Sequence, residues 1–139
     1  MKRSGFFLAV IATTLVVTTA RAGVSVTLEC NSSTHPGLHN LLDLDYAART
    51  VRNYSVNDDG APYTFNGTPM ADRTFPAQVT DKEIMWTEQM AAGPNYLTLG
   101  RYSGTLTVEI HFQSTRGAAT TTNRYQCRRW TPEARQQKF

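Results

Sequence analysis

The sequence predicts an all-β protein, built as a single antiparallel β-barrel or β-sandwich of about seven or eight short strands. Apolar residues recur at every second position through much of the chain, as in strands with one buried face. Gly, Pro, Asn and Asp interrupt these runs at short intervals, and no segment shows the period of a convincing amphipathic helix. A lipocalin-like barrel is one architecture that fits this pattern.

The start of the chain has the three parts of a secretory signal peptide. Two positive residues follow Met1, residues 6–17 are apolar or Thr, and Ala20-Arg21-Ala22 precedes the expected cleavage point. The apolar run is shorter than the roughly 18 residues that a membrane-spanning helix requires. We therefore expect residues 1–22 to be a signal peptide and residues 23–139 to form one β domain, exported to the periplasm or secreted.

The charge of the expected mature chain is balanced but unevenly distributed. Without the leader, 11 of the 14 Lys and Arg residues remain, against 11 Asp and Glu. Six of these basic residues lie between Arg116 and the C-terminus, where Glu133 is the one acid. A basic C-terminal segment of this kind is suited to binding an anionic surface or an acidic partner. A solvent-exposed strand and tail without a binding role has the same composition. Nucleic acid is not expected, because few aromatic residues are interleaved with the basic ones.

The first half of the domain contains most of the predicted strands. Val24, Val26, Leu28 and Cys30 alternate with polar residues and predict the first strand. A turn is predicted at Asn57-Asp58-Asp59-Gly60. Further strands are predicted at residues 42–46, 50–56, 63–65, 75–79 and 83–87.

The clearest strand covers residues 105–112, whose even-numbered residues, from Leu106 to Phe112, are all apolar. Residues 96–101 precede it across Tyr102-Ser103-Gly104, which predicts a hairpin. Residues 113–120 are predicted to be a polar loop, and residues 123–129 to return as a third strand.

A short C-terminal helix is predicted at Thr131-Pro132-Glu133. Thr is a good N-cap residue, Pro suits the first helical position, and an acid follows. The helix would have one or two turns.

The two cysteines, Cys30 and Cys127, lie near the two ends of the domain. Export would place them where disulfides persist, and no Cys-x-x-Cys spacing indicates a redox pair. We expect one structural disulfide between the first and last strands. Pairing of those strands would close the sheet and remove its exposed edges.

Several short motifs resemble those of small exported bacterial β-domain proteins of unknown function with one early and one late Cys. These are Leu28-Glu29-Cys30, Leu42-Asp43-Leu44-Asp45, Ile84-Met85-Trp86, the segment from Arg101 to Leu106, and Tyr125-Gln126-Cys127. The layout is also similar to that of the periplasmic inhibitors of c-type lysozyme, which are small β-barrels. Those inhibitors carry a Ser-Gly-x-x-Tyr loop, whereas here Tyr102 precedes Ser103 and Gly104.

No catalytic or metal-binding arrangement is predicted. Ser103 lies in a turn without a nucleophile-elbow pattern, and a hydrolase that uses His111 with Glu109 is a weaker alternative. His35 and His39 are separated by Pro and Gly, which prevent the helix that would turn both toward one ion. No cofactor is expected. Whether the Asn-x-Ser/Thr sequences at positions 31, 53 and 66 carry glycans depends on the host.

The candidate partner-binding residues combine aromatic and basic side chains, which are favoured in recognition surfaces. They are Arg101, Tyr102 and Ser103 in the predicted turn, and Arg128, Arg129 and Trp130 near the C-terminus. These residues predict a monomeric, non-catalytic binding or inhibitory module that contacts another protein. The alternatives are a carrier of a small apolar ligand inside a barrel, or a structural protein of the cell envelope.

Overall fold

A computed structural model describes residues 25–30 and 35–130. The predicted signal peptide and the predicted C-terminal helix lie outside these residues. Within the described part, no helix is long and apolar enough to cross a membrane. The protein is all-β and antiparallel, as the sequence predicts.

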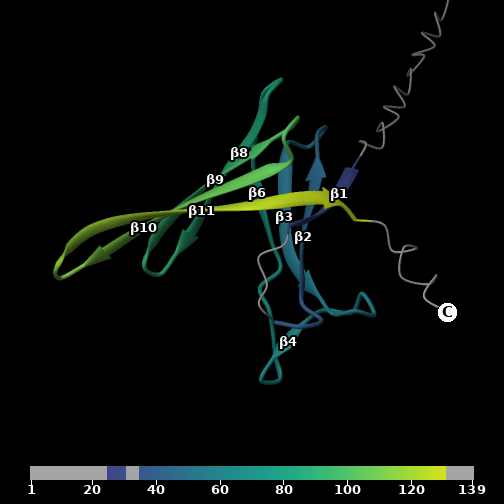
Figure 1. Cartoon of the computed structure of the whole chain (residues 1–139), viewed down its shortest axis with the longest axis horizontal. Helices are drawn as coiled ribbons and strands as arrows, with labels where there is room; N and C mark the ends of the chain where they lie inside the picture. The colour runs from purple at the N-terminus through teal and green to yellow at the C-terminus, as the bar shows by residue number, and fades with distance from the viewer. Residues whose placement is uncertain (1–24, 31–34, 131–139) are drawn as a thin grey trace, which may run out of the picture.

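The chain forms a nine-stranded sheet and a separate two-stranded ribbon, β4–β5 (Figure 1). The order in the main sheet is β6-β3-β2-β1-β11-β10-β9-β8-β7. The strands are β1 Ser25–Cys30, β2 His39–Asp45, β3 Thr50–Val56, β4 Thr64–Phe65, β5 Thr68–Pro69, β6 Arg73–Pro76, β7 Gln78–Val79, β8 Glu83–Met90, β9 Gly93–Gly100, β10 Thr105–Ser114 and β11 Gly117–Arg129.

The sheet curls into a nearly closed barrel. Its two edge strands, β6 and β7, are separated in the chain by Ala77 alone, so one segment leads from one edge of the sheet to the other. The strand count is slightly higher than predicted, because the run predicted at 75–79 is divided at Ala77 and because the short strand β5 was not predicted. The Ala77 N–H donates to the Arg49 carbonyl, next to the Thr50–Pro76 pair of β3 and β6, and pairing with β8 begins at Gln78.

The first and last strands pair, as predicted, and a disulfide joins them. Cys30 lies opposite Cys127 in the β1–β11 register, and the two form the disulfide. This seam is short, since β1 and β11 have three paired positions. The bond therefore fastens the barrel at one of its shortest strand pairings.

The prediction of a polar loop at residues 113–120 is wrong. β10 and β11 form one long hairpin that turns between Ser114 and Gly117, and it projects from the barrel (Figure 1). Thr and Ala side chains from Ala118 onward pair with β10 residues up to the turn. Thr is a favourable strand residue, and hydrogen bonding to the neighbouring strand made this segment a strand although its own hydrophobic pattern was weak.

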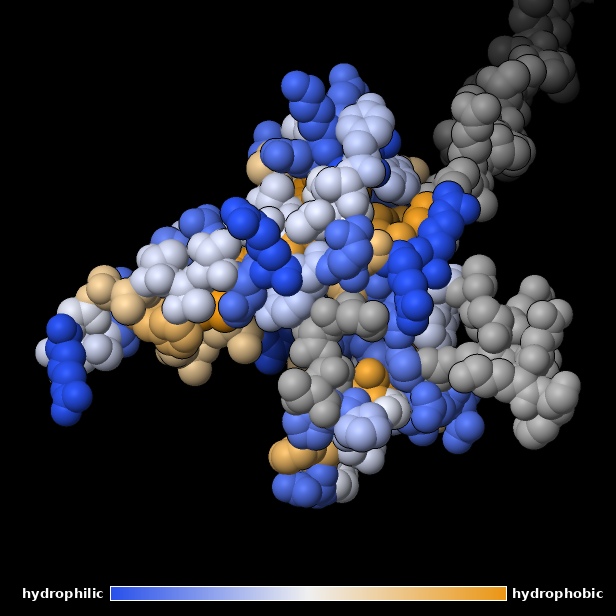
Figure 2. All heavy atoms as spheres, in the orientation of Figure 1, coloured by the Kyte–Doolittle hydropathy of each residue, from blue (hydrophilic) through white to orange (hydrophobic). Residues whose placement is uncertain are grey.

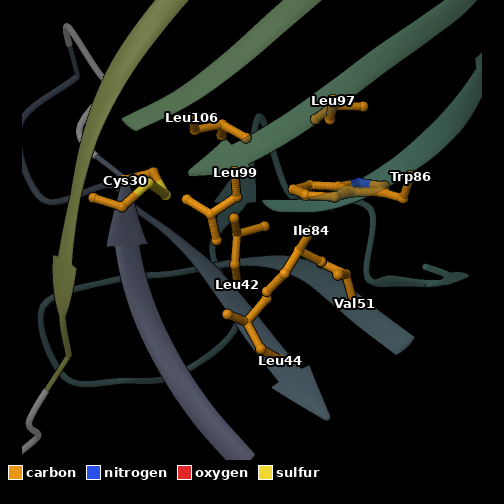
Figure 3. Close-up of a cluster of buried hydrophobic side chains, with 10 residues drawn as sticks. Cys30, Leu42, Leu44, Val51, Ile84, Trp86, Leu97, Leu99 and Leu106 are labelled. Carbon is orange, nitrogen blue, oxygen red and sulfur yellow. A yellow bond between two sulfur atoms is a disulfide. The ribbon is translucent and has the colours of Figure 1, made fainter. Parts of the chain in front are cut away.

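The core lies where the inner faces of the two sides of the barrel meet. Leu42, Leu44 and Val51 point toward Ile84 and Leu99 from the opposite strands (Figure 3). Trp86, Leu97 and Leu106 extend the cluster, which ends at the disulfide. These are the positions that the two-residue repeat places on the buried faces.

Candidate functional site

Polar residues replace apolar ones on the inner face at one end of the barrel. Toward that end, Leu42 is followed by Asn40 on the inner face of β2, and Trp86 by Glu88 on that of β8. The cross-strand register aligns these positions, since Asn40 pairs with Ser55 and Glu88 with Asn95. We call the set the polar collar: it consists of Asn40, Asn53, Ser55, Arg73, Glu88 and Asn95.

The polar collar surrounds a cavity of about 330 Å³. Its remaining wall is apolar and comes from both sides of the barrel: Cys30, Leu42, Met70, Ala71, Phe75, Met90, Leu97, Leu106, Val108 and Tyr125. A mainly apolar wall with a few convergent polar groups is typical of small-molecule sites, and the volume lies at the lower end of their range.

Glu88 is held in a fixed position within this cavity. Its Oε1 atom accepts hydrogen bonds from Asn53 Nδ2 at 2.9 Å and from Trp86 Nε1 at 3.0 Å. Because Asn53 lies on β3 and Glu88 on β8, the bond from Asn53 also joins the two sides of the barrel. A second contact in the collar, from Ser55 Oγ to Asn40 Oδ1 at 2.8 Å, orients the Asn40 amide.

Two methionines stand at the mouth of the cavity. Met70 is 43 % exposed and Met90 is 45 % exposed, although both line the cavity. Apolar side chains also lie along the lower edge of the projecting arm of the molecule (Figure 2), and Phe112 of the long hairpin is exposed. Flexible thioether side chains adapt to ligands of different shape, which suits a binding entrance.

The predicted partner-binding turn lies on the β9–β10 connection. Tyr102 is 88 % exposed, whereas Arg101 is held in place by its neighbours. The Arg101 guanidinium donates to the Thr80 carbonyl at 2.8 Å and lies 5.3 Å from the Tyr46 ring centroid. Ser103 Oγ accepts a bond from the Thr105 amide, so its hydroxyl has a turn-forming role.

Arg128 and Trp130 belong to a network on the outside of the barrel. Arg128 donates to Glu29 Oε2 through Nε at 3.0 Å and Nη2 at 2.9 Å, and His39 Nδ1 bonds the other oxygen of Glu29. His39 Nε2 contacts Asp58 Oδ1 at 2.9 Å, and the His39 ring lies 5.5 Å from that of Trp130. Burial raises the pKa of Glu29, but the hydrogen bonds from His39 and Arg128 outweigh the effect of burial and bring that pKa below its ordinary value.

The structure brings some of the predicted partner-binding residues together. Arg101, Arg128 and Arg129 line a second hollow of about 250 Å³ at the end of the barrel away from the polar collar. Tyr102, Ser103 and Trp130 do not line it. The six residues are therefore divided between an exposed turn, an arginine-lined hollow and the outer face of the sheet.

The polar collar was not predicted from the sequence. A usable signal was present: the two-residue repeat places Asn53 and Ser55 on the same face as Val51, and Glu88 on that of Ile84 and Trp86. A polar residue at an inward position predicts either a buried hydrogen bond or a cavity. Distinguishing the two requires the partner strand, because Asn53 and Glu88 are 35 residues apart.

Among the described residues, the contacts of His111 do not support the alternative of a hydrolase that uses His111 with Glu109. The His111 ring packs edge-on against Tyr96, with 5.0 Å between the ring centroids. Glu109 lies opposite Tyr96 and Thr122 in the strand register. No nucleophile lies beside His111 in the contacts of the described residues.

Comparisons of the chain with protein-family models, with curated proteins and with solved structures found no match.

Proposed function

We propose that this protein is a non-catalytic binding protein that holds one small, mainly apolar molecule in the cavity at the polar collar. The cavity itself carries this proposal: an apolar wall with oriented polar groups on one side and adaptable methionines at the entrance. The Cys30–Cys127 disulfide accords with an exported protein in an oxidising compartment.

The volume of the cavity sets the size of the ligand. A cavity of about 330 Å³ lies at the lower end of the range for small-molecule sites, which limits the ligand to a small molecule. A single short alkyl chain or one aromatic ring with a small headgroup meets this limit. A phospholipid with two long chains is too large to be enclosed.

The test uses n-octanol and n-octylammonium, which match this size. Trp130→Phe leaves Trp86, whose indole bonds Glu88, as the remaining tryptophan, so its fluorescence reports on the cavity. Val108 lines the cavity, so Val108→Phe fills part of it and should weaken binding about tenfold or more. Thr107→Phe, one position away on the other face of β10, is the matched control and should bind normally.

If neither probe produces a saturable change in the Trp86 signal, or if both Phe variants bind like the parent protein, the cavity is not a ligand site. Native mass spectrometry of the unmodified protein gives an independent measure of a bound probe.

A second candidate function is protein binding through the β9–β10 turn. Tyr102 is nearly fully exposed on a backbone that hydrogen bonds from Arg101 and Gln126 keep in place. Aromatic side chains presented on an ordered turn are favoured contact residues. The similarity in layout to inhibitors of c-type lysozyme supplies the partner to test.

Inhibition of c-type lysozyme by the wild-type protein, lost in Tyr102→Ala, is the expected result of this second function. If neither protein slows the enzyme at micromolar concentration, the inhibitor hypothesis fails. The result leaves the cavity proposal unaffected, because Tyr102 does not line the cavity.

A further inference from the structure

We propose that the cavity selects a ligand with a cationic headgroup, such as an alkylammonium, and that Glu88 forms the ion pair with it. This inference rests on the proposed function. It adds the charge of the ligand to its size and apolar character.

The first support is the state of the Glu88 carboxylate. Both hydrogen bonds that orient it end on Oε1. In the described part of the chain, no hydrogen bond reaches Oε2 and no Lys, Arg or His side chain lies within the 4.0 Å limit of an ion pair with Glu88. One oxygen is therefore positioned by the protein, and the other is available to a ligand.

Several other carboxylates of the described residues are used differently. Glu29 is paired with Arg128 and His39, and Asp43 and Asp72 both lie beside Arg52. Glu88 differs in that the groups that hold it are neutral, an amide and an indole. Neutral donors fix the orientation of the carboxylate without compensating its charge.

The second support is the cost of placing an uncharged ligand there. A ligand that fills the cavity removes water from Glu88, which is unfavourable for a charged group without a partner. A cationic headgroup replaces the lost water with a charge-assisted hydrogen bond. The apolar body of the same ligand then contacts Leu97, Leu106 and Val108 on the wall.

Arg73 is the competing charged group in the cavity. It is exposed and makes no ion pair with Glu88. An exposed guanidinium keeps most of its hydration and gains less from a ligand than a fixed carboxylate does. We therefore assign the headgroup to Glu88, and the experiment includes an anionic probe that would pair with Arg73 instead.

The experiment compares n-octylammonium, n-octanol and n-octanoate, which share one apolar chain and differ in charge. Affinities are measured by the Trp86 fluorescence of Trp130→Phe and by calorimetry. Glu88→Gln keeps an oxygen that accepts from Asn53 and Trp86 but removes the charge. Glu109→Gln removes an exposed carboxylate from β10 outside the cavity and serves as the matched control.

We expect n-octylammonium to bind about ten- to hundredfold more tightly than n-octanol, as is typical of a hydrogen bond between charged groups. This preference should disappear in Glu88→Gln, persist in Glu109→Gln, and decrease with added salt. Unchanged circular dichroism and thermal midpoint of Glu88→Gln exclude unfolding as the cause.

Three results would overturn the inference. Equal affinities for n-octanol and n-octylammonium leave the cavity a ligand site without charge selection. Tightest binding of n-octanoate, lost in Arg73→Gln, reverses the sign of the selected charge. Absence of binding by every probe removes both the selectivity and the proposed function.

Discussion

The disulfide should provide a large part of the stability of this protein. Cys30 and Cys127 are separated by 97 residues, so in the unfolded state the bond closes almost the whole described chain into one loop. In the loop-entropy relation, a loop of this length contributes about 4.7 kcal/mol at room temperature. A typical domain has an unfolding free energy of about 5–15 kcal/mol, so loss of the bond should leave the protein only marginally stable.

The position of the bond adds a local effect. It lies on the β1–β11 seam, which has three paired positions, whereas β10 and β11 pair along the whole length of their hairpin. Without the bond, the seam should be among the first parts of the barrel to open. Amide hydrogens of β1 should then exchange faster than those of β9 and β10.

Urea denaturation measures the global effect in two ways. Wild-type protein in reductant keeps both thiols in the core, while a Cys30→Ala, Cys127→Ala variant also loses two buried sulfur atoms. With a urea slope of about 1.5 kcal/mol/M, the midpoint should fall by about 3 M on reduction and slightly more in the variant. Reductant should not change the urea midpoint of the variant, which has no disulfide to reduce.

A loss of less than about 1 kcal/mol on reduction would refute this reasoning. It would mean that the reduced unfolded chain retains enough structure to keep its ends close, so that the bond has little entropy to remove.

Three further predictions concern single positions. Leu99→Ala should lower the unfolding free energy by about 2–5 kcal/mol, because Leu99 is 2 % exposed at the centre of the core. Urea denaturation measures this loss, and a loss under about 1 kcal/mol would contradict the placement of Leu99 in the core. Tyr102→Ala should change that free energy by no more than about 0.5 kcal/mol in the same assay, and a larger loss would show that the exposed ring has a structural role. The stabilisation from Glu29 should be fully present above its ordinary pKa of 4.5 and lost as the pH falls through its lower folded-state pKa. Acid titration of the unfolding free energy tests this, and the free energy of Glu29→Gln should depend less on pH below about pH 5. An identical pH profile of the two proteins would exclude the Glu29 carboxyl as the cause.

Strand positions were predictable where alternation and turn chemistry agree. The third predicted strand, residues 50–56, matches β3, and residues 96–101 and 105–112 form the β9–β10 hairpin as expected. The start of β9 was placed too late. Gly93 opens that strand at φ 136°, and a Cβ there would lie 2.2 Å from the His111 carbonyl oxygen, a close approach that the adjacent strand imposes.

The candidate site was harder to predict than the fold. Arg101 and Tyr102 were selected for their side-chain chemistry, but Arg101 is occupied by the Thr80 carbonyl and the Tyr46 ring. Glu88 was not selected, because its importance depends on Asn53, which lies on the other side of the barrel. Neither the contacts of Arg101 nor the hydrogen bond between Asn53 and Glu88 can be recognised within a short stretch of sequence.

The sequence by itself determined the fold class, most strand positions and the disulfide. Periodicity, turn residues and cysteine placement act locally or through composition, so they can be read without knowing which strands are neighbours. Only the tertiary structure decided how the sheet curls so that β6 and β7 become its edges, where the inner face becomes polar, and that neutral groups hold the Glu88 carboxylate in the cavity. These properties depend on contacts between strands far apart in the chain, and a polar residue at an inward position acquires its role from the strand that faces it.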